Sequence, residues 1–253
     1  MKRIVIKVGS AVLTEKNNIA QERMLNLVSL IANLQKSYDI ILVTSGAVAA
    51  GYGALKMDKS KQIGKKAIAA AGQPILMTNY KKQFDIYGID TAQILLTEDD
   101  FDSRKRTFMF QEIINAHLAN DILPIINEND ITSTPEQLFG DNDQLSANVS
   151  HATDSDLLVI LSDIDGYYDK NPQEHKDAKL YKIIDHISEE MLNKDMSPNN
   201  EFATGGIATK LKAADFLMRH GRKMLLCNGF DLSAARSFLE DGEHTLGTLF
   251  VAK

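Results

Sequence analysis

The feature that most constrains the fold is a series of short aliphatic runs separated by longer amphipathic segments. The runs are rich in Val, Ile and Leu, as expected for strands buried on both faces of a parallel sheet. The intervening segments carry apolar residues at helical spacing, for example Leu27, Leu30 and Leu34. This alternation predicts βαβ units, with helices covering a mainly parallel sheet. The predicted strands are Ile4–Val8, Ile40–Thr44, Ala92–Leu96, Leu123–Ile126, Leu157–Leu161 and Lys223–Cys227, and the predicted helices are Arg23–Lys36, Lys65–Tyr87, Phe108–Asn120 and Ile207–His220.

Composition limits the class of protein. With 253 residues and 44% hydrophobic content, the chain is of ordinary globular type, with one or two domains. A net charge of −6 argues against a general nucleic-acid-binding protein. No apolar run approaches the ~20 residues of a membrane span, and Lys7, Gly9 and Ser10 interrupt any signal-peptide core. The single cysteine, Cys227, excludes an intrachain disulfide. We therefore expect a cytoplasmic protein with neither a membrane nor a nucleic-acid partner.

The predicted organisation has two lobes, residues 1–153 and 154–253, without an internal repeat. Two irregular stretches, Tyr168–Asp177 and Lys194–Thr204, are predicted loops, and the second has the length of a lid or a mobile surface segment. There is no GxxxxGK[ST] motif and no complete GxGxxG motif, so the sequence excludes a P-loop enzyme and gives little support to a dinucleotide fold.

Polar residues at predicted strand ends are the candidates for function, and the first is Lys7. A lysine inside an aliphatic strand is costly unless its charge has a partner. It could project into solvent from an edge strand. Alternatively, it could lie at the carboxyl end of its strand, beside the turn Gly9–Ser10, whose bare backbone can approach a phosphate.

A second candidate is Val43–Gly51, in which a strand leads through a turn of small residues into a small-residue helix. The free N–H groups at the start of a helix can bind an anion. The same sequence also suits a tight turn that packs against a neighbouring element, so the segment alone leaves both interpretations open.

Two further segments are rich in carboxylates and amides. Ile125–Asp130 runs from a strand directly into Asn-Glu-Asn-Asp, a set suited to binding an ammonium and a carboxylate together. Gly140–Ala147 is a predicted turn followed by a helix. Its aspartates could cap that helix or could orient lysines and a polar ligand.

The last candidate combines Thr204–Lys210 with Leu161–Asp163. A Gly-Gly turn opens a helix that carries Lys210 in its first turns, while Ser162 and Asp163 follow another predicted strand. Backbone N–H groups, the helix dipole and a lysine would together favour a phosphate.

Taken in order, these segments resemble the amino acid kinase family along nearly the whole chain, from Lys7 to Phe250. The resemblance implies a three-layer αβα sandwich with a mainly parallel central sheet. It also implies one kinase domain over 1–253, with the first lobe on the amino-acid side and the second on the nucleotide side, and no C-terminal PUA module. The motifs that carry it are Val43–Ala47, Ala71–Gln73, Ile126–Asp130, Gly140–Asp143 and Thr204–Gly206 followed by Lys210.

The resemblance also assigns roles to residues. Lys7 and Lys210 would contact the phosphoryl group in flight, and Asp143 would hold both lysines in place. Mg²⁺ would bridge the phosphates of ATP without direct protein ligands. The implied amino-acid site is Ser45, Gly46, Asn127, Asp130, Asp141 and Asn142, and the implied nucleotide site is Lys7, Gly9, Ser10, Ser162, Asp163, Thr204, Gly205, Gly206, Ile207, Ala208, Thr209 and Lys210.

Within the family, the resemblance is greatest to the enzymes that phosphorylate the γ-carboxylate of L-glutamate with ATP, the first step of proline biosynthesis. Such an acceptor is already an anion at neutral pH, because its free pKa is ~4.3, so no general base is needed. The alternative is a relative that acts on acetylglutamate or a nucleoside monophosphate. The family also leads us to expect a homodimer or homotetramer and feedback inhibition by proline.

Overall fold

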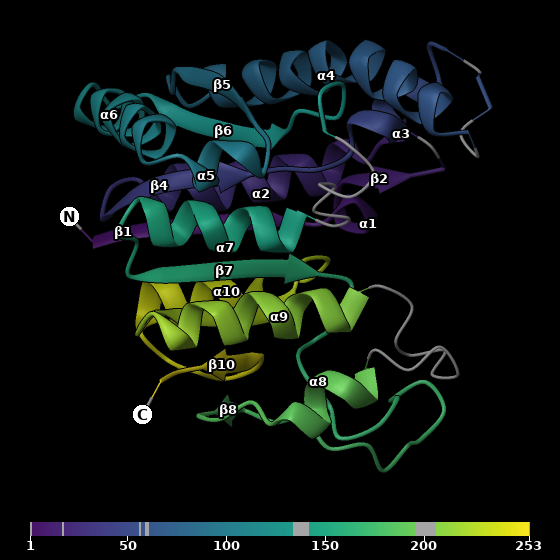
Figure 1. Ribbon diagram of the computed structural model, residues 1–253, viewed down its shortest axis with the longest axis vertical. Helices are drawn as coiled ribbons and strands as arrows, with labels where there is room; N and C mark the ends of the chain where they lie inside the picture. Colours follow the sequence, from purple (N-terminus) through teal and green to yellow (C-terminus); the bar gives the residue numbers. More distant parts are fainter. Residues whose placement is uncertain are drawn as a thin grey trace.

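The computed structural model describes residues 2–16, 18–55, 57–58, 61–133, 142–195 and 206–252, with side chains described only to residue 192 in the fifth range. Its centre is an eight-stranded sheet in the order β5-β6-β4-β1-β7-β9-β10-β8 (Figure 1). Within the described ranges its strands pair in parallel, except that β9 and β10 are antiparallel. The strands are β1 (Lys2–Val8), β4 (Tyr38–Val43), β5 (Thr91–Leu96), β6 (Leu123–Glu128), β7 (Leu157–Ser162), β8 (Ile183–Ile184), β9 (Lys223–Asn228) and β10 (Thr248–Phe250), and a separate hairpin joins β2 (Thr14–Glu15) to β3 (Asn18–Ile19).

Helices cover both faces of this sheet. They are α1 (Ser10–Leu13), α2 (Gln21–Leu34), α3 (Ala47–Tyr52), α4 (Gln62–Asp85), α5 (Asp99–Asp102), α6 (Arg104–Ala119), α7 (Asn142–Ala152), α8 (Glu189–Asp195), α9 (Gly206–Arg219) and α10 (Ser233–Arg236), followed by a π-helical turn, η2 (Ser237–Asp241).

The two faces bury separate apolar cores, as strand geometry requires. Successive side chains of a strand point to opposite faces. Ile4 and Ile6 of β1 therefore pack in a core with α2 and α4, whereas Val5 packs in a second core with α6, α7 and α9. Figure 1 shows α7 and α9 lying across the same face of the sheet. These layers confirm the three-layer αβα class.

The predicted regular elements are confirmed, with shifted ends. Each of the six predicted strands and four predicted helices has a counterpart in the structure. The strand predicted at Ile40–Thr44 begins earlier, at Tyr38, and ends at Val43, because Thr44 opens the turn that leads into α3. The short elements β8 and β10 were not predicted, since runs of two or three residues carry no clear periodicity.

The predicted loop at Tyr168–Asp177 is confirmed as irregular chain, closed by an isolated bridge between Tyr168 and Leu180. The loop predicted at Lys194–Thr204 begins instead inside α8, and its residues 196–204 lie outside the described ranges. Among the residues that the structure describes, no helix has both the length and the apolarity to cross a membrane.

Helices α4 and α6 are each followed by a residue in the left-handed conformation, and this pair allows a test of local stability. After α4 that residue is Gly88, with φ 68°, and after α6 it is Asp121, with φ 57°. Both ends have the hydrogen bond of a Schellman cap, from Ile89 N to Phe84 O at 3.2 Å and from Ile122 N to His117 O at 3.0 Å.

We expect Asp121→Gly to raise the free energy of unfolding by about 0.5–1 kcal/mol, because glycine adopts this conformation without strain. The matched change Gly88→Ala should lower it by about 1 kcal/mol, since only backbone strain opposes a methyl group there. Urea denaturation measures both values. A loss of stability in Asp121→Gly would contradict the prediction.

Candidate active site

Lys7 lies at the carboxyl end of a central strand. β1 pairs with β4 on one side and β7 on the other, so the alternative of an edge strand with Lys7 in solvent was wrong. The residue is only 1% exposed. Because Lys7 shares the face of Val5, its side chain lies on the side of the sheet that α7 and α9 cover.

Three buried charges meet at Asp143, in the first turn of α7. Lys7 Nζ donates to Asp143 Oδ1 at 2.6 Å, and Lys210 Nζ donates to Asp143 Oδ2 at 3.1 Å. The hydroxyl of Thr209 donates to the same Oδ2 at 3.0 Å. The Asp143 side chain is 0% exposed and that of Lys210 is 6% exposed. Two lysines that are distant in the sequence thus converge on one buried carboxylate, and these three groups together carry one net positive charge.

Asn142, the residue before Asp143, joins three of the predicted segments. Its Nδ2 donates to Asn127 Oδ1 at 2.8 Å, to Ser45 Oγ at 3.1 Å and to Thr44 O at 2.5 Å. These contacts bring the ends of β4 and β6 to the start of α7. Three of the residues predicted to hold an amino acid, Ser45, Asn127 and Asn142, therefore lie beside the lysine cluster, and Asp141 lies outside the described residues.

Asp130 stands near two lysines just beyond β6. Burial raises the pKa of its carboxyl group above the ordinary value, and the charges of Lys65 and Lys66 oppose that rise. Lys66 Nζ also donates to Ser133 O at 2.5 Å and Ile131 O at 3.2 Å, so α4 holds the chain that follows Asp130.

The small-residue turn after β4 has a steric cause. Gly46 has φ 100°, which favours glycine, and its carbonyl accepts from Ala50 N in α3 at 2.9 Å. A Cβ atom on Gly72 of α4 would lie 1.8 Å from Ala47 O, so the two helices touch through their backbones. The tight-packing interpretation of this segment is therefore confirmed, and its anion-binding interpretation stays a prediction.

One group of the residues predicted to hold a nucleotide lies at the carboxyl ends of β1 and β7. Gly9 N donates to Leu161 O at 3.0 Å, and Ser10 begins α1. Ser162 ends β7 and donates through Oγ to Asp163 Oδ1 at 3.0 Å.

The other predicted nucleotide residues open α9. Gly206 O accepts from Lys210 Nζ at 2.9 Å and from Thr209 Oγ1 at 3.0 Å. Ala208 is half-buried in the same turn, whereas the side chain of Ile207 packs in the core. Thr204 and Gly205 lie outside the described residues.

Sequence reasoning missed several side chains that support the site. Gln73 Oε1 accepts from Asn127 Nδ2 at 2.8 Å. The buried hydroxyls of Tyr80 and Thr44 are 2.8 Å apart, and burial raises the pKa of Tyr80. The sequence had singled out the motif Ala71–Gln73, but it did not indicate that Gln73 contacts Asn127.

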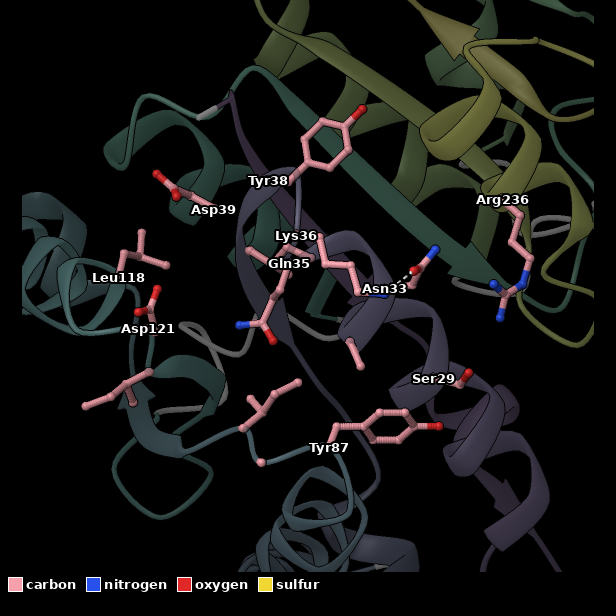
Figure 2. Close-up of a pocket in the computed structure, with 15 residues that line it drawn as sticks. Ser29, Asn33, Gln35, Lys36, Tyr38, Asp39, Tyr87, Leu118, Asp121 and Arg236 are labelled. Atoms are coloured by element: carbon pink, nitrogen blue, oxygen red, sulfur yellow. Dashed lines mark hydrogen bonds between the residues drawn. The ribbon is translucent and has the colours of Figure 1, made fainter.

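A pocket of about 540 Å³ opens at the amino ends of the strands, opposite the candidate active site at their carboxyl ends. Figure 2 shows Gln35 and Lys36 from the end of α2, Asp39 from β4, and Asp121 around it. Its lining comes from the amino ends of strands and the carboxyl ends of helices, so it is separate from the cluster around Asp143. No sequence motif marked it.

Known proteins resemble this chain in sequence and in fold. The model of the "Amino acid kinase family" matches residues 2–228. The chain is 54% identical over 256 residues to a glutamate 5-kinase from Wolinella succinogenes, covering 99% of this chain and 98% of that protein. It is 50% identical over 253 residues to a glutamate 5-kinase from Leishmania donovani, covering 100% and 96%. A UMP kinase structure from Ureaplasma parvum shares the fold, with a TM-score of 0.64 and 17% identity over 99% of this chain and 98% of that one.

Proposed function

Because the chain belongs to the amino acid kinase family, we propose that it transfers the γ-phosphoryl group of ATP to the γ-carboxylate of L-glutamate. The product is L-glutamyl 5-phosphate, and its formation is the first step of proline biosynthesis. The chain is thus a phosphotransferase with a carboxyl group as acceptor. The observation that carries the choice of acceptor is the identity of 54% over almost the full length of a glutamate 5-kinase.

The proposed mechanism is electrostatic. The acceptor carboxylate has a free pKa of ~4.3 and needs no base, but it must approach a polyanionic phosphoryl group. Two unit charges 4 Å apart interact by ~4 kcal/mol at an effective dielectric constant of ~20. Lys7 and Lys210 would offset this repulsion as charge develops in the transition state, and Asp143 would keep their ammonium groups converged.

The proposed amino-acid site lies where β4 and β6 meet α7. Asn142 and Asn127 would offer amide groups to the substrate, Ser45 and Gly46 would line the turn beside it, and the carboxylate of Asp130 would accept from the α-ammonium group. Asp141 is also proposed to bind the amino-acid substrate.

The proposed nucleotide site lies where β1 and β7 meet α9, so that each lobe contributes one lysine. Its backbone N–H groups would come from Ser10 and the residues from Thr204 onwards, with Gly9, Ser162 and Asp163 beside them. Among the described residues there is no group of three or more His, Cys, Asp or Glu side chains placed to hold a metal ion. We propose that Mg²⁺ arrives bound to the phosphates of ATP.

The remaining proposals concern the setting of the reaction. We propose a cytoplasmic homodimer or homotetramer that proline inhibits, with no nucleic-acid or membrane partner. The net charge of −6 supports the absence of a nucleic-acid partner. Light scattering of the purified protein tests the assembly, and titration with proline tests the inhibition.

Trapping with hydroxylamine tests the acceptor. In the presence of ATP and Mg²⁺, an acyl phosphate reacts with hydroxylamine to give a hydroxamate. We expect a hydroxamate from free L-glutamate and none from N-acetyl-L-glutamate or UMP under the same conditions. Formation of ADP with UMP, or of a hydroxamate from N-acetyl-L-glutamate alone, would overturn the proposed function.

Replacing Asp130 by asparagine should raise KM for glutamate about ten-fold or more and leave KM for ATP unchanged, because a charge-assisted hydrogen bond to the ammonium group is lost. Burial raises the pKa of Asp130, so protonation of its carboxylate begins at a higher pH than for an exposed aspartate. KM for glutamate in the unsubstituted enzyme should therefore rise as pH falls through that raised pKa, and Asp130→Asn should lack this dependence. Steady-state kinetics across pH measures both. An unchanged KM in the variant would count against the assignment.

A further inference from the structure

We propose that Gln73 is a positioning residue for the amino-acid acceptor, because it holds the amides of Asn127 and Asn142 in a single orientation. This inference rests on the proposed function. It concerns the motif Ala71–Gln73, for which neither the mechanism nor the sequence supplied a role.

Four side-chain amides form a chain from the edge strand β5 to the start of α7. Gln73 Nε2 donates to Gln93 Oε1 at 3.2 Å, Asn127 Nδ2 donates to Gln73 Oε1 at 2.8 Å, and Asn142 Nδ2 donates to Asn127 Oδ1 at 2.8 Å. The bond between Gln93 and Gln73 is exposed, whereas the bond between Asn142 and Asn127 is buried. The inner bonds should therefore carry most of the effect.

One backbone group sets the direction of this chain. The N–H of Glu128 donates to Asn127 Oδ1 at 2.9 Å, and only the oxygen of an amide can accept such a bond. The Nδ2 of Asn127 must then face Gln73, and Gln73 must present its oxygen. A reversed amide at Asn127 would set two donors against each other at Glu128 and two acceptors against each other at Gln73.

The same order of donors and acceptors fixes the amide of Asn142, on the substrate side of the site. The Nδ2 group of Asn142 is directed at three protein oxygens, those of Thr44, Ser45 and Asn127. The oxygen Oδ1 of Asn142 is then the atom that this amide offers to a ligand. An acceptor oxygen beside the turn of Ser45 suits the α-ammonium group of an amino acid rather than a carboxylate or a phosphate.

Backbone contact between helices fixes where Gln73 lies. A Cβ atom on Gly72 would lie 1.8 Å from Ala47 O and one on Gly51 would lie 2.0 Å from Ile68 O, so α4 and α3 approach closely only through glycines. This contact holds the residue after Gly72 next to the helix that begins at the Ser45–Gly46 turn. The motif thus combines a close-approach glycine with an amide that reaches Asn127.

The test compares Gln73→Met with Gln93→Met, which makes the same chemical change at the exposed end of the chain. We expect Gln73→Met to raise KM for L-glutamate about ten-fold, since Asn127 loses a partner in a part-buried position, while KM for ATP stays within two-fold and kcat within three-fold. Gln93→Met should change each constant by less than two-fold. Gln73→Glu keeps an oxygen toward Asn127 and should retain more affinity for glutamate than Gln73→Met.

The outcomes separate this inference from the function on which it rests. If the unsubstituted enzyme forms no hydroxamate from glutamate, the proposed function fails. If it does, and Gln73→Met has an unchanged KM for glutamate, only the role of Gln73 is overturned. Equal rises in KM for glutamate and ATP, or an effect of Gln73→Met that persists undiminished in an Asn127→Ala background, would also overturn it. Thermal unfolding of each variant checks that it is folded.

Discussion

Replacing Lys7 or Lys210 by methionine is expected to lower kcat by about three orders of magnitude, with much smaller changes in both KM values. Recovery of ~4 kcal/mol in the transition state corresponds to about a thousand-fold in rate. Each ammonium group is held at Asp143 before the reaction, so little reorganisation is needed when charge develops. Each single variant also leaves one lysine paired with Asp143, so we expect both proteins to fold.

The control for this prediction is Lys212→Met. Lys212 lies on α9, two residues after Lys210, but it is exposed. The same chemical change there should leave kcat within two-fold. Turnover near that of the unsubstituted enzyme in both Lys7→Met and Lys210→Met would show that the two ammonium groups do not stabilise the migrating phosphoryl group.

The sheet could be predicted because its strands are buried on both faces. A run such as Leu157–Leu161 must be aliphatic throughout when α7 and α9 cover one face and α1 and α10 lie on the other, so the sequence carries the signal continuously. The short strands β8 and β10 at the far edge lack such a signal. Their pairing depends on partners that are distant in the chain.

The candidate site, too, could be predicted from the sequence only in part. Lys7 was ambiguous in the sequence, because strand order decides whether a lysine at a strand end meets solvent or a carboxylate, and strand order is not a local property. Asp143 and Lys210 were identified through the resemblance. Gln73 had no assigned role, because its partner Asn127 is 54 residues away and the two meet only when α4 lies against β6.

The largest effect on stability is expected from Asp143→Asn. This change preserves size but removes the buried carboxylate to which the ammonium groups of Lys7 and Lys210 both donate. Breaking a buried ion pair in this way costs about 3–5 kcal/mol of unfolding free energy. For a chain of this length the loss corresponds to a fall in melting temperature of roughly 10 °C. Activity should be lost as well, because the two lysines repel each other when the carboxylate no longer holds them.

Two further variants show whether charge is the cause. Asp85→Asn breaks an exposed ion pair with Lys81 and should leave the melting temperature almost unchanged. The double variant Asp143→Asn, Lys7→Met removes one of the two buried ammonium groups that Asp143 normally pairs with, so its melting temperature should lie above that of Asp143→Asn alone. If the double variant is the less stable of the two, the loss arises from packing around Asp143 and not from buried charge. Recovery in the double variant would show that Asp143 stabilises the fold by neutralising buried lysine charge.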